Sequence, residues 1–354
     1  MTTRRIAVLA GDGIGPEVIA EGLRVLRAAE QIVPGDRFVL EEFSVGAGEF
    51  LRSGDPLPAG TLARIGGCDA VLLGAMGLPD VRRPDGVEMA PQLDLREHFE
   101  LYAGIRPIFL FHPDDSPLKT EKAGAIDLVI VRESTEGLFS ARKGTSSPAN
   151  SEACDVMRIT RRTSERLFRA AFRLAATRRK HVTLVDKANV LPSMAYFRAI
   201  FDEVAREFPE IATDRVYVDA AALYLVERPQ SFDVLVTENM FGDILSDLAA
   251  GLVGGMGMAP SADIGDAFAV FQPSHGSAPS IAGRGIANPV ATILSVAMMF
   301  DWFQAPERAG LIRQAVRWVF THQEMRTVEM GGGLGTRAMA DAILEAMAKN
   351  GSGL

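Results

Sequence analysis

The chain has 354 residues, of which 47% are hydrophobic and 23% are charged, and its formal net charge is −8. This length and composition predict an ordinary globular protein with two domains, or with one large α/β unit whose core is divided. The acidic balance argues against a nucleic-acid surface, which needs a clustered basic footprint. No apolar run approaches the roughly 18 residues that a membrane span requires.

The two cysteines and the N-terminus indicate a reducing compartment. Cys68 and Cys154 cannot form a disulfide framework, and neither has the close Cys/His spacing of a zinc site. The first residues, MTTRRIAVLAGDG, contain a short apolar run at 6–10 that is too short for a signal-peptide core. We therefore expect a cytoplasmic, soluble protein with its first strand near the N-terminus.

Short apolar runs alternate with helix-period segments along most of the chain. Strands are predicted at 5–10, 38–43, 69–74, 126–131, 181–186, 215–219 and 232–236. Helices are predicted at 16–29, 161–178, 190–207, 240–250, 288–304, 306–321 and 335–349. This alternation predicts an α/β fold with a largely parallel sheet. The stretch 113–124, PDDSPLKTEKAG, is the best candidate for an exposed connection.

Two glycine-rich loops are candidate ligand contacts. The first, AGDGIGPEV at 10–18, lacks the G-x-G-x-x-G spacing, so it is either a tight strand-to-helix turn or a ligand-contacting loop. The second, PSHGSAPSIAGRGIANP at 273–289, contains His275 and Asn288 and leads into a helix. Its free backbone N–H groups suit a phosphate or a nucleotide.

A pair of acids lies in the predicted helix within TENMFGDILSDLAAG, residues 237–251. Asp243 and Asp247 are four residues apart, so they share one face of that helix. Their neighbours are largely apolar, whereas solvated surface acids usually have polar neighbours. This pattern favours a hard divalent cation, Mg²⁺ or Mn²⁺, over plain surface acids.

Basic residues follow or flank several predicted strands. Lys187 comes directly after the strand at 181–186 and is either a snorkelling side chain or a base in a cleft. Arg96, Arg106 and Arg132 would together suit a di- or tricarboxylate, because guanidinium forks bind carboxylates bidentately. Each arginine could instead form a surface ion pair.

Taken together, these segments resemble the isocitrate/3-isopropylmalate dehydrogenase family of β-decarboxylating dehydrogenases. The resemblance runs from GDGIGPE at 11–17 to GGGLGTRA at 331–338 and includes LREHFELYAGIRP, DLVIVRESTEG and VDKANVLP. It implies an isopropylmalate dehydrogenase-like two-domain α/β fold with a large mixed or parallel sheet flanked by helices, and no Rossmann unit. Residues 1–99 with 252–354 would form the cofactor-side domain, and residues 100–251 the dimerisation and substrate-metal domain.

The resemblance also implies a reaction and its residues. The chain would be a homodimer that uses NAD and Mg²⁺ or Mn²⁺ to oxidise and decarboxylate a hydroxy di- or tricarboxylate. Lys187 and Asp219 would be catalytic residues borrowed from the other subunit, with Asp219, Asp243 and Asp247 as metal ligands. The substrate would contact Arg96, Arg106, Arg132, Gln92 and Leu93. The cofactor would contact Gly13, Ile14, Asn189, His275, Gly276, Ser277, Ala278, Ser280, Ile281 and Asn288.

The chain departs from the family pattern at a few positions. Phe139 stands where the family has a tyrosine that assists reprotonation after decarboxylation, so Tyr224 or water would have to replace that hydroxyl. Ser280 matches neither the acid typical of NAD-dependent members nor the basic residue typical of NADP-dependent ones. The segment RTVEMGGGLGT at 326–336 looks more like the NAD branch, so we expect NAD, with NADP as the alternative. Gln272 and Ser274 also differ from the usual residues.

Substrate choice in this family is set largely by the residues before Arg96, here VEMAPQL at 87–93. The serine and asparagine typical of isocitrate binders are absent, and the leucine pair that holds an isopropyl group is half present as Leu93. Pro91 suggests a locally reshaped pocket. The candidates are 3-isopropylmalate, isocitrate, homoisocitrate and tartrate- or malate-like acids. The alternative is an impaired or regulatory member that binds substrate and metal, or that oxidises without efficient decarboxylation because of Phe139.

Overall fold

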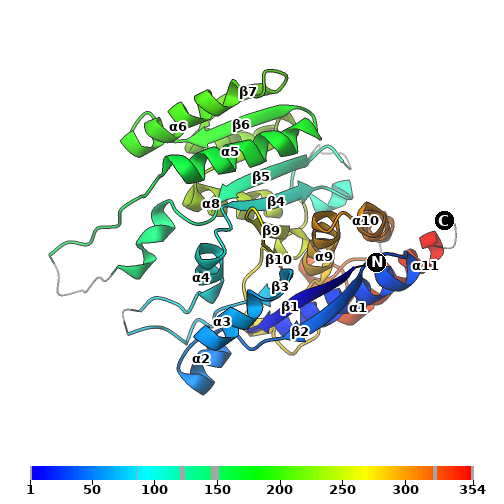
Figure 1. Cartoon of the computed structure of the whole chain (residues 1–354). Helices are drawn as coiled ribbons and strands as arrows, with labels where there is room; N and C mark the ends of the chain where they lie inside the picture. Colours follow the sequence, from blue (N-terminus) through cyan, green and yellow to red (C-terminus); the bar gives the residue numbers. More distant parts are fainter. Residues whose placement is uncertain (1, 85, 120–123, 145–150, 322–324, 352–354) are drawn as a thin grey trace. The chain divides into compact units, whose positions relative to one another are not determined.

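The computed structural model describes residues 2–84, 86–119, 124–144, 151–321 and 325–351 (Figure 1). The chain forms two compact units. The first comprises Met1–Leu95, Gly254–Ala262 and Ala267–Leu354, and the second comprises Arg96–Val253 and Asp263–Asp266. The division into functional domains at 1–99 with 252–354 and at 100–251 stays a prediction.

The first unit contains strands in the order β2 (Arg37–Glu42), β1 (Thr3–Gly11), β3 (Ala70–Ala75) and β10 (Ala269–Pro273), followed by residues 260–262 of β9 (Pro260–Ile264), whose last two residues belong to the second unit. β1 runs parallel to β2 and β3, and β10 runs parallel to β3. Helices α1 (Gly15–Ile32), α9 (Val290–Trp302), α10 (Pro306–Phe320) and α11 (Thr336–Gly351) pack on one another. Helix α9 is buried along most of its length, because its side chains are apolar on nearly every face.

The second unit contains strands in the order β4 (Ala103–Phe109), β5 (Asp127–Glu133), β8 (Val234–Thr237), β6 (His181–Asp186) and β7 (Ala212–Tyr217). β4 is antiparallel to β5, whereas the remaining pairs are parallel, so the sheet is mixed. Helices α5 (Arg161–Ala176) and α6 (Pro192–Ala205) cover one face of these strands. Helices α7 (Val218–Glu227) and α8 (Asn239–Gly251) cover the other.

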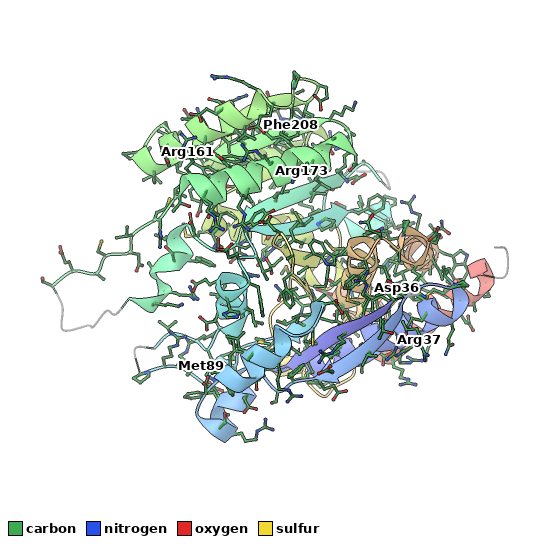
Figure 2. All side chains as sticks on the ribbon, in the orientation of Figure 1. Asp36, Arg37, Met89, Arg161, Arg173 and Phe208 are labelled. Atoms are coloured by element: carbon green, nitrogen blue, oxygen red, sulfur yellow. The ribbon has the colours of Figure 1, made fainter. Side chains whose placement is uncertain are left out.

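The alternation of side chains along β5 explains how one strand serves both faces. Val129 and Val131 pack with α5 and α6, whereas Leu128 and Ile130 pack with α7 and α8. The core on the α5–α6 side is rich in phenylalanine. Phe208, labelled in Figure 2, stacks on Phe172 with ring centroids 5.0 Å apart. Both cores contain side chains of α8 and of β5, and this packing fixes the position of the helix relative to the strand.

Shorter elements complete the description. The remaining α-helices are α2 (Ala47–Ser53), α3 (Ala59–Ile65) and α4 (Pro91–His98). Short 3-10 helices lie at η1 (Pro113–Asp115), η2 (Leu138–Lys143), η3 (Pro229–Ser231), η4 (Met256–Met258), η5 (Pro279–Ile281) and η6 (Val328–Met330). Among the described residues, no helix is long and apolar enough to cross a membrane.

The expected α/β class is confirmed, with local corrections. The pattern predicts a strand over 215–219, but β7 ends at Tyr217 and α7 begins at Val218. Pro91 is the first residue of α4 rather than a helix breaker, because a proline at the first helical position loses no hydrogen bond. In the stretch 113–124 the chain forms η1, and residues 120–123 lie outside the described part.

Candidate active site

Three buried arginines from three different elements form the centre of the site. Arg96 lies in the last turn of α4, Arg106 in β4 and Arg132 in β5, and their exposed fractions are 5%, 5% and 2%. Burial, together with the charges of Arg106 and Arg96, lowers the pKa of Arg132 to about 9. Arg132 therefore remains charged at neutral pH, and the three cations attract anions. All three arginines belong to the second unit, so this unit by itself forms the expected group.

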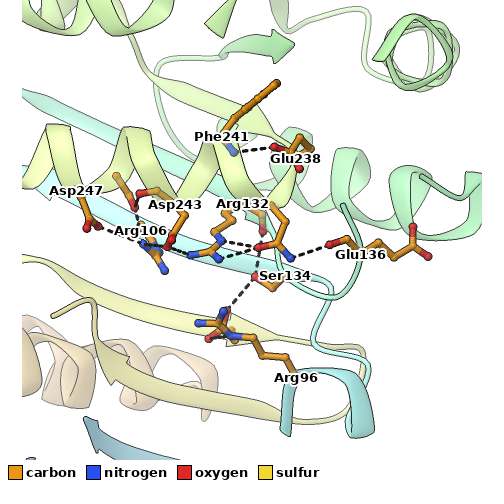
Figure 3. Close-up of polar contacts among 12 residues, drawn as sticks. Arg96, Arg106, Arg132, Ser134, Glu136, Glu238, Phe241, Asp243 and Asp247 are labelled. Atoms are coloured by element: carbon orange, nitrogen blue, oxygen red, sulfur yellow. Dashed lines mark hydrogen bonds and ion pairs between the residues drawn. The ribbon is translucent and has the colours of Figure 1, made fainter. Parts of the chain in front are cut away.

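Two carboxylates of α8 face this cluster (Figure 3). Asp243 forms an ion pair with Arg132, and Arg106 Nη1 lies 3.5 Å from Asp243 Oδ1 and 3.8 Å from Asp247 Oδ1. Their side chains are 41% and 57% exposed, so ligands can reach them from solvent. Burial and then the charge of Asp243 raise the pKa of Asp247, because two neighbouring carboxylates repel each other. A divalent cation would relieve that repulsion, so the donor set fits Mg²⁺ or Mn²⁺.

Hydrogen bonds orient two of the guanidinium groups. Asn239 Oδ1 accepts from Arg132 Nε at 3.0 Å and from Nη2 at 2.7 Å, and Ser246 Oγ accepts from Arg106 Nη1. Arg106 Nε is buried and has no hydrogen-bond partner within the described chain. A buried donor without a partner is costly. An anionic ligand such as a carboxylate would satisfy it.

A third carboxylate beside the arginines, Asp263, is not predicted from the sequence. Asp263 Oδ2 accepts from Arg96 Nε at 2.9 Å, and Asp263 Oδ1 accepts from Ser134 Oγ at 3.0 Å. Its segment in β9, PSADI, lacks the apolar run that marks a strand, so no pattern indicated a buried acid there. Asn239 and Ser246 were also missed, because nothing in the pattern separates them from ordinary polar residues of a helix.

Lys187 and Asp219 form a pair of their own. Lys187 Nζ lies 2.5 Å from Asp219 Oδ1, which places the first residue after β6 beside the first turn of α7. The hydrogen bond from Lys187 lowers the pKa of Asp219. Within the residues that the structure describes, no group of three or more His, Cys, Asp or Glu side chains could hold a metal ion. One chain thus brings Asp243 and Asp247 together, but it does not add Asp219 to them.

Phe139 lies in η2, and its ring centroid is 5.2 Å from the Arg132 guanidinium carbon. The side chain that replaces the expected tyrosine therefore faces the arginine cluster rather than a distant core. Tyr224, the suggested substitute, instead stacks with Arg228, whose guanidinium carbon is 4.0 Å from the ring centroid.

A separate pocket of about 390 Å³ lies in the first unit. Its lining includes six of the predicted cofactor contacts, Ile14, His275, Gly276, Ala278, Ile281 and Asn288. The remaining lining residues, which the sequence does not predict as cofactor contacts, are Met256, Gly257, Ile286, Ala287, Val328 and Glu329. His275 Nε2 is buried without a partner in the described chain, and burial lowers the pKa of His275. A neutral imidazole with a free nitrogen, amid apolar walls, fits a dinucleotide better than a bare anion.

The loop GDGIG forms one edge of this pocket. Gly13 has φ +59°, and a Cβ at this position would lie 1.9 Å from Ser277 O, so only glycine fits. This close approach lets Ile14 N donate to Ser277 O at 2.8 Å, which ties the two glycine-rich loops together. The expectation that both loops contribute to one ligand site stays a prediction, and their contact supports it.

The remaining predicted residues lie as follows. Ser280 is exposed in η5, and Asn189 is exposed two residues after Lys187 in the second unit. Gln92 and Leu93 are half-buried in α4, and Gln92 Oε1 has no partner among the described residues. Gln272 is buried in β10. The unpartnered Gln92 oxygen could accept a hydrogen bond from a ligand, and the substrate contact at Gln92 stays a prediction.

Comparisons with known proteins identify the family of the chain. A family profile described as isocitrate/isopropylmalate dehydrogenase matches residues 5–343. A protein named 3-isopropylmalate dehydrogenase from Moorella thermoacetica is 48% identical over 88% of this chain and 89% of its own length. One of the same name from Aquifex aeolicus is 41% identical over 98% of this chain and 97% of its own length.

Solved structures give the same result. The crystal structure of isocitrate dehydrogenase from Methylococcus capsulatus matches with a TM-score of 0.88 and 37% identity, covering 97% of this chain and 99% of that one. The β-decarboxylating dehydrogenase from Thermococcus kodakarensis, in its apo form, matches with a TM-score of 0.81 and 39% identity over 98% and 96% of the two chains. The chain therefore belongs to the isocitrate/isopropylmalate dehydrogenase family and is a β-decarboxylating dehydrogenase.

Proposed function

We propose that this enzyme uses NAD⁺ and Mg²⁺ or Mn²⁺ to oxidise and decarboxylate a 3-substituted (R)-malate, with 3-isopropylmalate as the first substrate to test. The observation that carries the proposal is the cluster of three buried arginines beside the exposed carboxylates of α8. Relatives at 48% and 41% identity bear the name 3-isopropylmalate dehydrogenase, which supports this substrate. The apolar Leu93 supports an apolar 3-substituent.

The side chains divide the work by their chemistry. Arg106 and Arg132 bind the substrate carboxylates through their guanidinium forks. Asp243 and Asp247 hold the divalent cation, which, when bound, lowers the pKa of the substrate hydroxyl and polarises the carbonyl that replaces it. Lys187 takes the hydroxyl proton as a neutral amine, and Asp219, whose Oδ1 lies 2.5 Å from Lys187 Nζ, stabilises the ammonium group that forms.

The first-unit pocket around His275 and Asn288 holds NAD⁺, which accepts the hydride when bound. Ser280 is neutral and exposed. It offers neither a carboxylate to bind the ribose 2′-hydroxyl of NAD⁺ nor a positive charge to bind the 2′-phosphate of NADP⁺. We place the enzyme with the NAD-dependent members, and NADP⁺ is the alternative acceptor. We also propose a cytoplasmic homodimer whose subunits share their active sites.

Phe139 supports a second candidate function. A phenyl ring cannot donate a proton, and the loss of one general acid slows its step about 10²- to 10⁴-fold. The alternative is therefore an enzyme that oxidises its substrate but decarboxylates it slowly, or a protein that binds substrate and metal without turnover. In both cases a tyrosine at position 139 should restore what is missing.

The test compares wild type with Phe139→Tyr on 3-isopropylmalate, isocitrate, homoisocitrate, D-malate and D-tartrate, with Mn²⁺ and either NAD⁺ or NADP⁺. NADH absorbance reports the oxidation, and CO₂ release reports the decarboxylation. Phe208→Tyr, the same substitution on a half-buried ring that stacks on Phe172 rather than on Arg132, serves as the control.

We expect wild type to reduce NAD⁺ with 3-isopropylmalate and to release CO₂ at the same rate. If NADH forms ahead of CO₂ in wild type but not in Phe139→Tyr, the enzyme is the slow decarboxylase of the second candidate. If neither protein reduces NAD⁺ or NADP⁺ with any of these acids, the proposed function is wrong.

A further inference from the structure

The acid that holds Arg96 differs from the two acids of α8. Its side chain is 2% exposed, whereas those of Asp243 and Asp247 are 41% and 57% exposed. A carboxylate this deeply buried is not available to a cation from solvent. Its two oxygens are already used by Arg96 Nε and Ser134 Oγ, at 2.9 and 3.0 Å. Asp263 therefore acts on the arginine cluster itself.

The local backbone is shaped to admit this acid. A Cβ at Gly104 would lie 2.7 Å from Ser134 Oγ and 3.0 Å from Asp263 Oδ1, so the strand β4 leaves room for the pair by having glycine there. Gly104 is opposite Arg132 in the β4–β5 register. The carboxylate is thus placed beside the same two strands that carry Arg106 and Arg132.

The charges of the site can then be assigned to partners. A divalent cation on Asp243 and Asp247 would compensate those two carboxylates and release Arg106 and Arg132 for ligand carboxylates. Arg96 remains compensated by the buried Asp263. Two guanidinium groups are left for two carboxylates, so a third ligand carboxylate would find no free guanidinium group and would be repelled by the negative charge of Asp263.

We propose that Asp263 is a specificity-determining residue that makes the site select dicarboxylates, such as 3-alkylmalates, over tricarboxylates of the isocitrate class. This inference rests on the proposed function, because it assigns the arginine cluster to the substrate. Asp263 acts by repulsion: it weakens the wrong ligand rather than adding a contact to the right one. It also fixes the Arg96 guanidinium through Nε, with Ser134 holding its second oxygen.

The sharpest variant is Asp263→Asn, which removes the charge and keeps the shape. The asparagine oxygen can still accept from Arg96, and its amide can donate to Ser134 Oγ. The measured quantity is the ratio of kcat/KM for isocitrate to kcat/KM for 3-isopropylmalate. We expect this ratio to rise by at least about tenfold in Asp263→Asn, since one charge near the ligand is removed. Asp263→Glu, which keeps the charge, should keep the wild-type ratio.

A matched control separates specificity from stability. Asp233 is likewise buried and ion-paired, with Oδ1 2.8 Å from Arg178 Nε, but it precedes β8 at the opposite end from α8. Asp233→Asn should lower the melting temperature without changing the ratio. If Asp263→Asn behaves in the same way, with both substrates slowed equally, Asp263 is merely structural and the inference is wrong.

Binding measurements keep this test independent of turnover. Calorimetry with Mg²⁺ and no dinucleotide gives the dissociation constants of 3-isopropylmalate and isocitrate. If wild type shows no turnover with any acid, the proposed function fails, but a shift of at least about tenfold in the ratio of dissociation constants would still support the role of Asp263. An unchanged binding ratio in Asp263→Asn would overturn it whether or not the enzyme turns over.

Discussion

Glu133 follows Arg132 along β5 and is also buried, but its side chain serves the next loop. Its Oε1 accepts from Thr135 N at 2.6 Å and from Thr135 Oγ1 at 2.7 Å, while Oε2 accepts from Glu136 N at 2.7 Å. These bonds fold the chain back toward η2, where Phe139 faces Arg132. Burial nevertheless raises the pKa of Glu133 to about 7, because the hydrogen bonds offset only part of the desolvation.

This pKa predicts a pH dependence of stability. The folded state binds the Glu133 proton up to about pH 7, whereas the unfolded state loses it near its ordinary value of 4.5. Between these values the folded state holds more protons, so the contribution of Glu133 to stability is fully present below pH 4.5 and is lost as the pH rises through 7. The loss is up to roughly 3 kcal/mol.

The comparison of wild type with Glu133→Gln isolates this effect from the other titrating groups. We expect the unfolding free energy of wild type relative to Glu133→Gln to fall as the pH increases from about 5 to about 8. Urea unfolding across that range measures it. A difference that stays constant with pH would show that Glu133 is ionised throughout.

Helix α8 positions the site as a unit. Its N-cap residue, Glu238, accepts from Phe241 N at 2.7 Å, and one turn later Gly242 packs against Arg132. A Cβ at Gly242 would lie 2.7 Å from both Arg132 Cβ and Cγ. The closeness of helix and strand is what brings Asp243 to Arg132.

Two alanine substitutions in this helix make a matched pair. Gly251 is the last residue of α8, and a Cβ added to it would meet no other atom within 4 Å. Gly251→Ala should therefore leave stability within about 0.5 kcal/mol of wild type. Gly242→Ala must displace Arg132 or the helix, which should cost about 1–3 kcal/mol and weaken Mn²⁺ binding. Unfolding curves and Mn²⁺ titrations check both. Equal effects of the two substitutions would mean that the close packing at Gly242 does not position the acids.

The elements that the sequence predicted and those that it missed differ in a physical way. Strands such as β6, HVTLVD, are short apolar runs ending in a turn, and the pattern located them. β9, PSADI, is just as buried, but its proline, serine and aspartate are typical of loops. Contacts with Arg96 and Ser134, which are distant in sequence, hold its acid there. The sequence predicts a strand over the start of helix α7, because Val216 and Val218 alternate with other residues as in a strand.

The same distinction holds for the candidate site. Arg106, Arg132 and the two acids of α8 were recognised because each follows a regular pattern on its own strand or helix. Asp263 is 167 residues from Arg96, and no local pattern encodes that pairing. Long-range partners of buried charges are therefore what sequence reasoning could not supply.

At the scale of the whole molecule, apolar side chains on α7 and α8 stay exposed in the single chain. Leu223 and Val226 of α7 are 52% and 44% exposed, and Ile244 of α8 is 59% exposed. Exposed apolar residues on neighbouring helices favour a protein partner. Ile244 lies next to Asp243, so a second subunit bound there would come close to the proposed cation site. Lys187 and Asp219, which pair with each other away from the α8 acids in one chain, would then reach the site of the partner.

Shared sites can be tested with two inactive variants combined in one dimer. Arg106→Ala removes a substrate contact and Lys187→Ala removes the base, so each homodimer should be inactive. In a heterodimer purified through two different tags, shared sites would place both defects in one site and leave the other intact, giving about half of the wild-type activity. Sites built within one chain would each keep one defect, and the heterodimer would stay inactive. The Lys187→Ala/Asp219→Asn heterodimer is the control: both residues come from the same side of the interface, so neither of its sites is intact and no activity should return.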